Sequence, residues 1–133
     1  MILAIPLLLI TVVIYNILAL ITGTAMEASL WAISLPSDAV LNLSVGDLIV
    51  FLALILLFFE IFKSTRTSVS SIVDHLLSMG LFVVCLLELI LVPSFGNATF
   101  LFLTLMSLID VIAGFTVTIV AARRDIGIDE RIT

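Results

Sequence analysis

The chain has 133 residues, of which 63% are hydrophobic and only 11% charged, and its mean hydropathy is +1.46. No soluble domain of this size keeps so apolar a composition, so the sequence predicts a protein embedded in a lipid bilayer. The net charge is −5, and the five basic residues form no stripe that could neutralise a phosphate backbone, which excludes nucleic acid as a partner.

Four apolar segments have about the length needed to cross a bilayer, roughly 20 residues. They predict an all-α membrane protein, in which four transmembrane helices form one antiparallel bundle and leave no room for a second domain. The expected spans are residues 2–23, 46–62, 72–92 and 98–121, with an outer loop at 24–45, a cytoplasmic loop at 63–71 and a cytoplasmic tail at 122–133.

Short motifs place the ends of the helices. Ser44 and Asp47 have the S-x-x-D spacing that caps helix N-termini, as do Ser71 and Asp74, and these pairs predict the starts of the second and third helices. Residues 93–97 begin with proline and contain glycine. This predicts a tight turn that makes the third and fourth helices antiparallel neighbours.

The basic residues give the orientation, since Lys and Arg near the ends of spans stay on the cytoplasmic side during insertion. All of them fall in the cytoplasmic loop or the tail: Lys63, Arg66, Arg123, Arg124 and Arg131. Both termini are therefore predicted to face the cytoplasm. The small size and the short connections favour the inner membrane of a bacterium as the location.

The outer loop has a pattern of its own. Hydrophobic residues alternate with small or polar ones from Trp31 to Leu35, and the three residues that follow are typical of a turn. This predicts a short hairpin on the outer face of the membrane, with Trp31 at the level of the lipid headgroups. The alternative is a short interfacial helix over residues 26–33.

Small and polar residues mark the faces through which membrane helices pack, because lipid is as apolar as the side chains that it surrounds. Each predicted span has such a face at helical spacing. The residues assigned to packing between helices are Asn16 on the first span, Ser78 on the third, and Ser107, Gly114 and Thr118 on the fourth. One inward face per helix predicts a single bundle.

Acidic residues inside a bilayer are costly to bury and are presumed functional by default. Asp110 lies near the midplane, with no basic residue on any span at its depth. It is either neutral and hydrogen-bonded in a structural role, or it faces a wet cavity, a bound cation or a symmetry mate. The other three acids have local explanations. Glu60 can pair with Lys63, Asp74 can cap a helix, and Glu88 can reach water at the outer face.

His75 is the one side chain whose unperturbed pKa lies close to neutral pH. Its predicted depth matches that of Glu60 near the inner interface, so a contact between these two residues is expected. With Asp74, Glu88 and Asp110 they place titratable groups at three depths, which a proton or cation path needs.

The sequence offers little for catalysis. One histidine and one cysteine, Cys85, cannot supply a nucleophile with its base together with a metal site, and no glycine-rich phosphate loop is present. We therefore expect no enzyme, no cofactor and no bound metal. The first functional hypothesis is an oligomer-forming or accessory subunit, whose partner is a second copy or a larger membrane protein. The alternative is a homo-oligomeric channel or transporter that passes protons or cations along Asp110 and Glu88.

Overall fold

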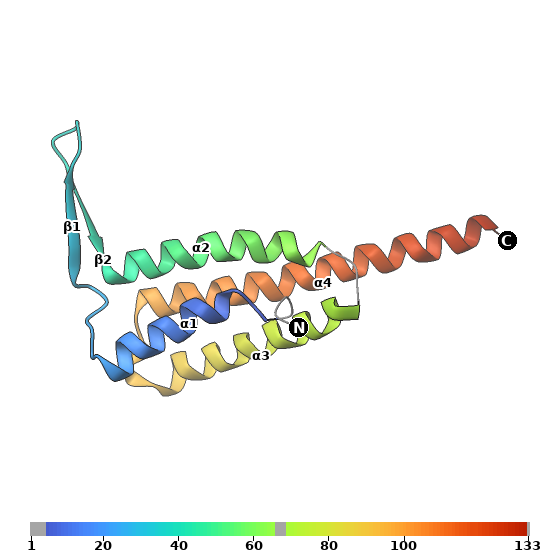
Figure 1. The fold of residues 1–133 in the computed structure, drawn as a ribbon, viewed down its shortest axis with the longest axis horizontal. Helices are drawn as coiled ribbons and strands as arrows, with labels where there is room; N and C mark the ends of the chain where they lie inside the picture. Colours follow the sequence, from blue (N-terminus) through green and yellow to red (C-terminus); the bar gives the residue numbers. More distant parts are fainter. Residues whose placement is uncertain (1–4, 66–68, 133) are drawn as a thin grey trace.

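A computed structural model describes residues 5–65 and 69–132, with side chains for all of these except 69–71 and 128–132. Four long elements run side by side, and a hairpin projects from one end (Figure 1). The order is α1 (Leu8–Asn16), the π-helix η2 (Ile17–Ile21), β1 (Ser29–Ser34), β2 (Val40–Ser44), α2 (Val45–Ser64), α3 (Val69–Leu91), the 3₁₀ turn η3 (Pro93–Phe95) and α4 (Ala98–Ile132). We call the end that carries β1, β2 and η3 the hairpin end, and the opposite end the tail end.

Three of the helices in the described part of the chain are long and apolar enough to cross a membrane: Val45–Ser64, Ile72–Leu91 and Ala98–Gly127. This indicates an integral membrane protein. The first apolar helix, Leu8–Ile21, has 14 residues and is about 21 Å long at 1.5 Å per residue, shorter than a bilayer core of about 30 Å. The predicted helices and the hairpin between the first two are confirmed, but only three helices reach the predicted span length.

Local sequence signals explain two of the helix starts. The Ser44 hydroxyl accepts a hydrogen bond from the Asp47 amide at 3.1 Å, and the Asp47 carboxylate accepts one from the Ser44 amide at 2.8 Å. This is the predicted capping box, and it starts α2. Asn97 caps α4 in the same manner, since its side-chain oxygen accepts the Phe100 amide hydrogen at 3.0 Å.

The predicted cap of α3 is wrong. The helix already begins at Val69, so Asp74 lies in its second turn, and the side chain of Ser71 lies outside the described residues. Arg66 and the side chain of Arg131 also lie outside the described residues. An S-x-x-D spacing does not show whether the backbone before the serine is already helical. Here Val69 and Ser70 already belong to the helix, so Ser71 cannot cap its start.

The hairpin end holds an aromatic cluster that fixes how the helices meet. The ring of Tyr15 in α1 lies 5.1 Å from that of Phe95 and 4.8 Å from that of Phe100, measured between centroids. The Asn97 amide donates a hydrogen bond to the Tyr15 hydroxyl. Because Phe95 follows Pro93 in the predicted tight turn, the turn both reverses the chain and seats α1 on α4.

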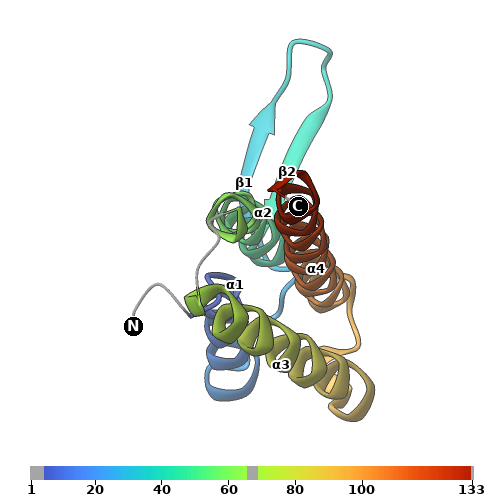
Figure 2. The same ribbon diagram turned by 90° about the vertical axis from the view of Figure 1, so that its right-hand side faces the viewer.

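The outward faces of the helices are apolar throughout, as Phe51, Phe58 and Leu91 illustrate with exposed fractions of 62%, 57% and 70%. Such exposure is unfavourable in water and is normal in lipid. Between the helices, which Figure 2 shows end-on, the buried residues are instead a mixture of apolar and polar side chains. Several small or polar residues thus lie between the helices, among them Thr11, Ser78 and Ser107.

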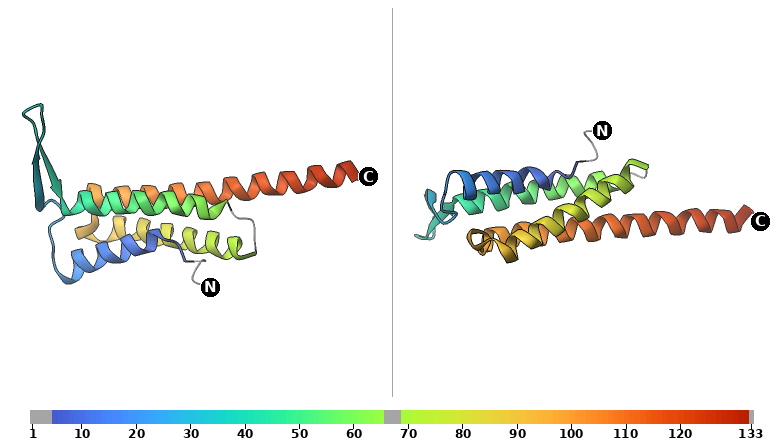
Figure 3. Two further views of the ribbon diagram at one scale, coloured as in Figure 1. Left: turned by 45° about the horizontal axis from the view of Figure 1, so that its top comes forward. Right: turned by 90° about the horizontal axis from the view of Figure 1, so that it is seen from below.

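The fourth helix continues well past the others at the tail end (Figures 1 and 3). Its 35 residues correspond to about 52 Å, against about 30 Å for a bilayer core. The segment predicted as a tail is therefore helical through Ile132. The apolar pattern stops near residue 121, but most of the following residues favour helices and no proline interrupts them.

Candidate functional site

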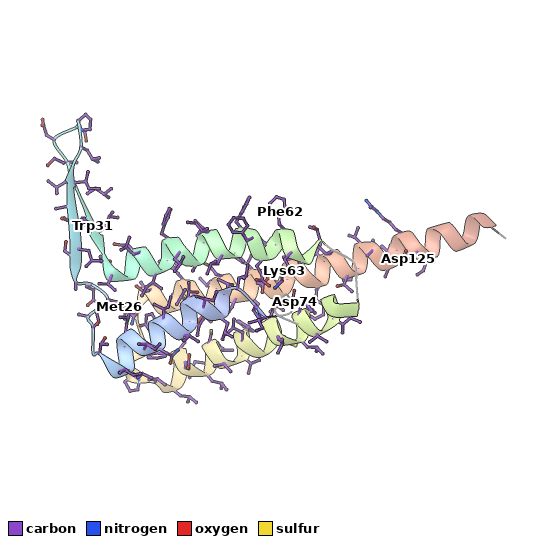
Figure 4. All side chains as sticks on the ribbon, viewed as in Figure 1. Met26, Trp31, Phe62, Lys63, Asp74 and Asp125 are labelled. Carbon is purple, nitrogen blue, oxygen red and sulfur yellow. The ribbon has the colours of Figure 1, made fainter. Side chains whose placement is uncertain are left out.

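The Lys63 ammonium is the centre of a polar cluster at the tail end. It lies 2.8 Å from Oε1 of Glu60 and 3.0 Å from Oδ1 of Asp74, and it donates a 3.0 Å hydrogen bond to the carbonyl oxygen of Ile5. An ammonium group has three N–H donors, and three oxygen atoms lie within 3.0 Å of this one. One side chain therefore links α2, α3 and the segment before α1. Figure 4 shows Lys63 and Asp74 pointing toward one another between the helices.

The Glu60 carboxylate completes the link to α1. Its Oε2 atom accepts a hydrogen bond from the Leu7 amide at 2.6 Å, while Oε1 binds Lys63. The first amides of a helix have no partner within the helix, and a carboxylate at that position also interacts favourably with the helix dipole. Glu60 is only 1% exposed. Its charge is thus balanced by an ammonium and by a helix N-terminus at once.

A small polar cavity of about 20 Å³ lies beside this cluster. That volume holds about one water molecule. The residues that line it come from α2, α3 and α4: Glu60, Ser64, Asp74, His75, Ser78, Asp110, Gly114 and Thr118. The structure thus brings four of the five predicted titratable residues together, along with three of the five predicted packing residues.

Asp110 faces the interior of its own bundle. It is 4% exposed, lines the cavity and interacts with the hydroxyl of Ser78 in α3. The sequence left open whether this residue meets a neighbouring subunit, a cation or a cavity. The geometry places it at a water-sized polar space that Glu60 and Asp74 of the ionic cluster also line.

His75 forms the wall of the cavity against α4. Its ring stands edge-on to Phe115, with 4.0 Å between centroids, and a Cβ atom on residue 114 would overlap the imidazole. Gly114 is therefore required for this close approach and does more than the helix–helix packing expected of it. The Nε2 atom of His75 is buried and has no hydrogen-bond partner among the residues that the structure describes.

Glu88 and Asn16 lie apart from this site. Glu88 is 13 residues beyond His75 on α3, which is about 20 Å along a helix. The Asn16 amide donates hydrogen bonds to the Val12 carbonyl at 3.0 Å and to the Glu88 carboxylate at 3.4 Å. The fully buried positions between His75 and Glu88 on α3, apart from Ser78, are the apolar Leu81 and Cys85.

Asn16 and Glu88 are the polar residues of an otherwise apolar groove between α1 and α3. The groove has a volume of about 640 Å³ and runs along α1 from Pro6 to Ile21. It remains open because α1 packs on α2 and α4, while α3 packs mainly on α4. Gly80 lies in the groove, and a Cβ atom there would meet nothing within 4 Å.

Two further observations limit the chemistry of the site. Ser107, the remaining predicted packing residue, is buried, and its hydroxyl donates to the Thr104 carbonyl of its own helix at 2.7 Å. Within residues 5–65 and 69–132, no group of three or more His, Cys, Asp and Glu residues is arranged to hold a metal ion.

Comparison with family models, curated proteins and solved structures finds no match to this chain.

The predicted pair of Glu60 and Lys63 is present, whereas the pairing of Lys63 with Asp74 and the contacts with residues 5–7 were missed. Helical spacing indicates neighbours within one helix, and both missed contacts join different segments. Pro6 was a usable signal, because proline is common where a helix begins and the amides that follow it need partners from elsewhere.

Replacing Lys63 by methionine is expected to destabilise the bundle by about 3–5 kcal/mol, since it leaves two buried carboxylates without a counter-charge. Unfolding by denaturant in mixed micelles measures the effect. Arg124→Gln is the matched control, because Arg124 is exposed on the part of α4 beyond the bundle, and this change should have almost no effect. Equal stability of the two variants would show that the cluster contributes little.

Proposed function

We propose that this protein is a subunit of a larger assembly in a bacterial inner membrane, where it contributes a four-span helical unit. The three long apolar helices support this, and the shorter apolar helix Leu8–Ile21 would supply the fourth crossing. Lys63, Arg123 and Arg124 lie at the tail end, which supports a cytoplasmic position for that end and for both termini. The hairpin end then faces away from the cytoplasm.

The observation that carries this proposal is the open groove between α1 and α3. In a self-sufficient four-helix bundle, each helix packs against two neighbours and closes the core. Here the seam between α1 and α3 is an open groove from Pro6 to Ile21, bridged near one end by the long Asn16–Glu88 hydrogen bond. Glycine at such a seam lets the backbone of another helix approach closely, which is the main source of helix association in lipid. A transmembrane helix from a neighbouring subunit fits this seam.

The polar end of the groove also favours a protein occupant. Asn16 and Glu88 are half-buried in the groove, and the hydrogen bond between them is long at 3.4 Å. In lipid, such groups associate with polar side chains of adjacent helices. A hydroxyl, amide or basic side chain on the incoming helix would complete their hydrogen bonds. The partner is a second copy of this chain or a larger membrane protein.

Gly80→Leu is expected to fill the groove and release the partner without unfolding the chain, because a side chain at this position meets open space. Gly127→Leu is the matched control, since Gly127 is also helical and open but lies in the extended part of α4. Native gels and crosslinking in membranes should show loss of the assembly in the first variant alone. An assembly that survives Gly80→Leu would contradict the proposal.

The cavity supports a second candidate function, the exchange of protons or cations. Three carboxyl groups and one histidine surround a water-sized space, against the single positive charge of Lys63. A proton entering the cavity would reduce this excess of negative charge. The route from the cavity toward Glu88 is less favourable, because Leu81 and Cys85 occupy the buried positions along α3.

Asp110→Asn is expected to abolish any dissipation of a pH gradient in liposomes if the cavity conducts, and to leave folding intact. The matched control is Asp125→Asn, which changes an exposed carboxylate outside the bundle. A gradient that persists with the well-folded original chain would remove this second candidate while leaving the first untouched.

A further inference from the structure

We propose that the β1–β2 hairpin is a lipid-surface anchor, whose apolar face lies on the membrane interface beside the helical bundle. The inference goes beyond the proposed subunit role, because it requires no partner protein. It rests on the strand register, on the exposure of one face of the hairpin, and on the direction in which the hairpin leaves the bundle.

The antiparallel register sorts the side chains of the hairpin onto two unlike faces. Trp31 pairs with Leu43, and Ile33 pairs with Leu41. Successive residues of a strand point to opposite faces, and paired residues share one face. These four large apolar residues therefore form one surface, which we call the Trp31 face. The opposite face contains the paired residues Ala32 with Asn42 and Ser34 with Val40.

Three of the four residues of the Trp31 face are exposed in the described chain, and Leu43 is half-buried. Trp31 is 60% exposed, Ile33 47% and Leu41 44%. An isolated two-stranded hairpin is only marginally stable in water, and exposed apolar area of this kind normally marks a contact with something else. The amphipathic pattern therefore requires an apolar medium on one side of the hairpin and water on the other.

The position of the hairpin at the end of the bundle places it at the boundary between lipid and water. It projects across the direction of the helices rather than along it (Figure 1), and the end-on view shows it extending outward beyond the bundle (Figure 2). Trp31 lies on this projecting segment, in its half nearer to α2 (Figure 4), where it pairs with Leu43. When the helices cross a bilayer, a hairpin at their end must lie along the membrane surface. One face then meets lipid and the other meets water.

Charge and aromatic content favour lipid over another protein surface. The hairpin strands carry no charged residue, and Glu27 and Asp38 flank them at the base and at the tip. Binding by this surface is therefore apolar and does not depend on anionic lipid. Tryptophan prefers the headgroup level of a bilayer. Because the helices tether the hairpin, the membrane surface is within reach at every protein concentration, whereas a second copy is not.

Trp31 is the only tryptophan of the chain, so its fluorescence reports on this face alone. The experiment uses the full chain in phosphatidylcholine vesicles, with lipids brominated near the headgroup as one quencher and iodide on both sides of the membrane as the other. The matched control is the double substitution Trp31→Phe with Ala32→Trp, which moves the indole to the opposite face of the hairpin.

We expect blue-shifted Trp31 emission that brominated lipid quenches and iodide does not, at all protein-to-lipid ratios. The control variant should show the reverse, with quenching by iodide. Strong quenching of Trp31 by iodide would overturn the proposal, because the face would then be in water. Protection from iodide that appears only at high protein-to-lipid ratio would also overturn it, since a second copy would then be the cover.

Discussion

The ammonium group of Lys63 and its three acceptors hold the tail end of this bundle together. Burial of charges is costly, and a buried ion pair stabilises a fold only where further hydrogen bonds satisfy the remaining donors and acceptors. That condition is met for Lys63 and Glu60, because Lys63 lies against Glu60, Asp74 and the Ile5 carbonyl, and Glu60 in turn accepts the Leu7 amide. The Asp74 Oδ1 atom has the ion-pair contact but no hydrogen-bond partner among the described residues. The Glu60–Lys63 pair lies within α2, the Asp74 contact joins α2 to α3, and the Ile5 and Leu7 contacts join α2 to the start of α1. The cluster therefore holds three segments together.

The position of α1 depends on this cluster and on a second attachment at the hairpin end. The start of α1 is held at the tail end by Glu60, and the chain after η2 is held at the hairpin end by the hydrogen bond from the Gly46 amide to the Met26 carbonyl, 2.8 Å long. With both ends attached on the side of α2, α1 leaves an open groove toward α3. The polar cavity forms where α3 and α4 come close, through the contact of His75 with Gly114.

The features that the sequence predicted correctly are those with local causes. The capping box at Ser44 and the turn after Pro93 depend on a few adjacent residues, and both are present. The hairpin predicted after residue 26 is also present, although the alternative of a helix over residues 26–33 stayed open because a short apolar pattern fits either period. The pairing of Lys63 with Asp74 was missed since it depends on how two helices meet. The relative position of two helices is set by side-chain packing, which the spacing of residues along the sequence does not show.

We expect Lys63 and Asp74 to act as a coupled pair across α2 and α3, and a double-mutant cycle in mixed micelles tests this coupling most directly. The cycle compares Lys63→Met, Asp74→Leu and the double variant by their free energies of unfolding. We predict that the double variant loses less stability than the sum of the single changes, with a coupling of about 1–3 kcal/mol. Strictly additive losses would contradict the account.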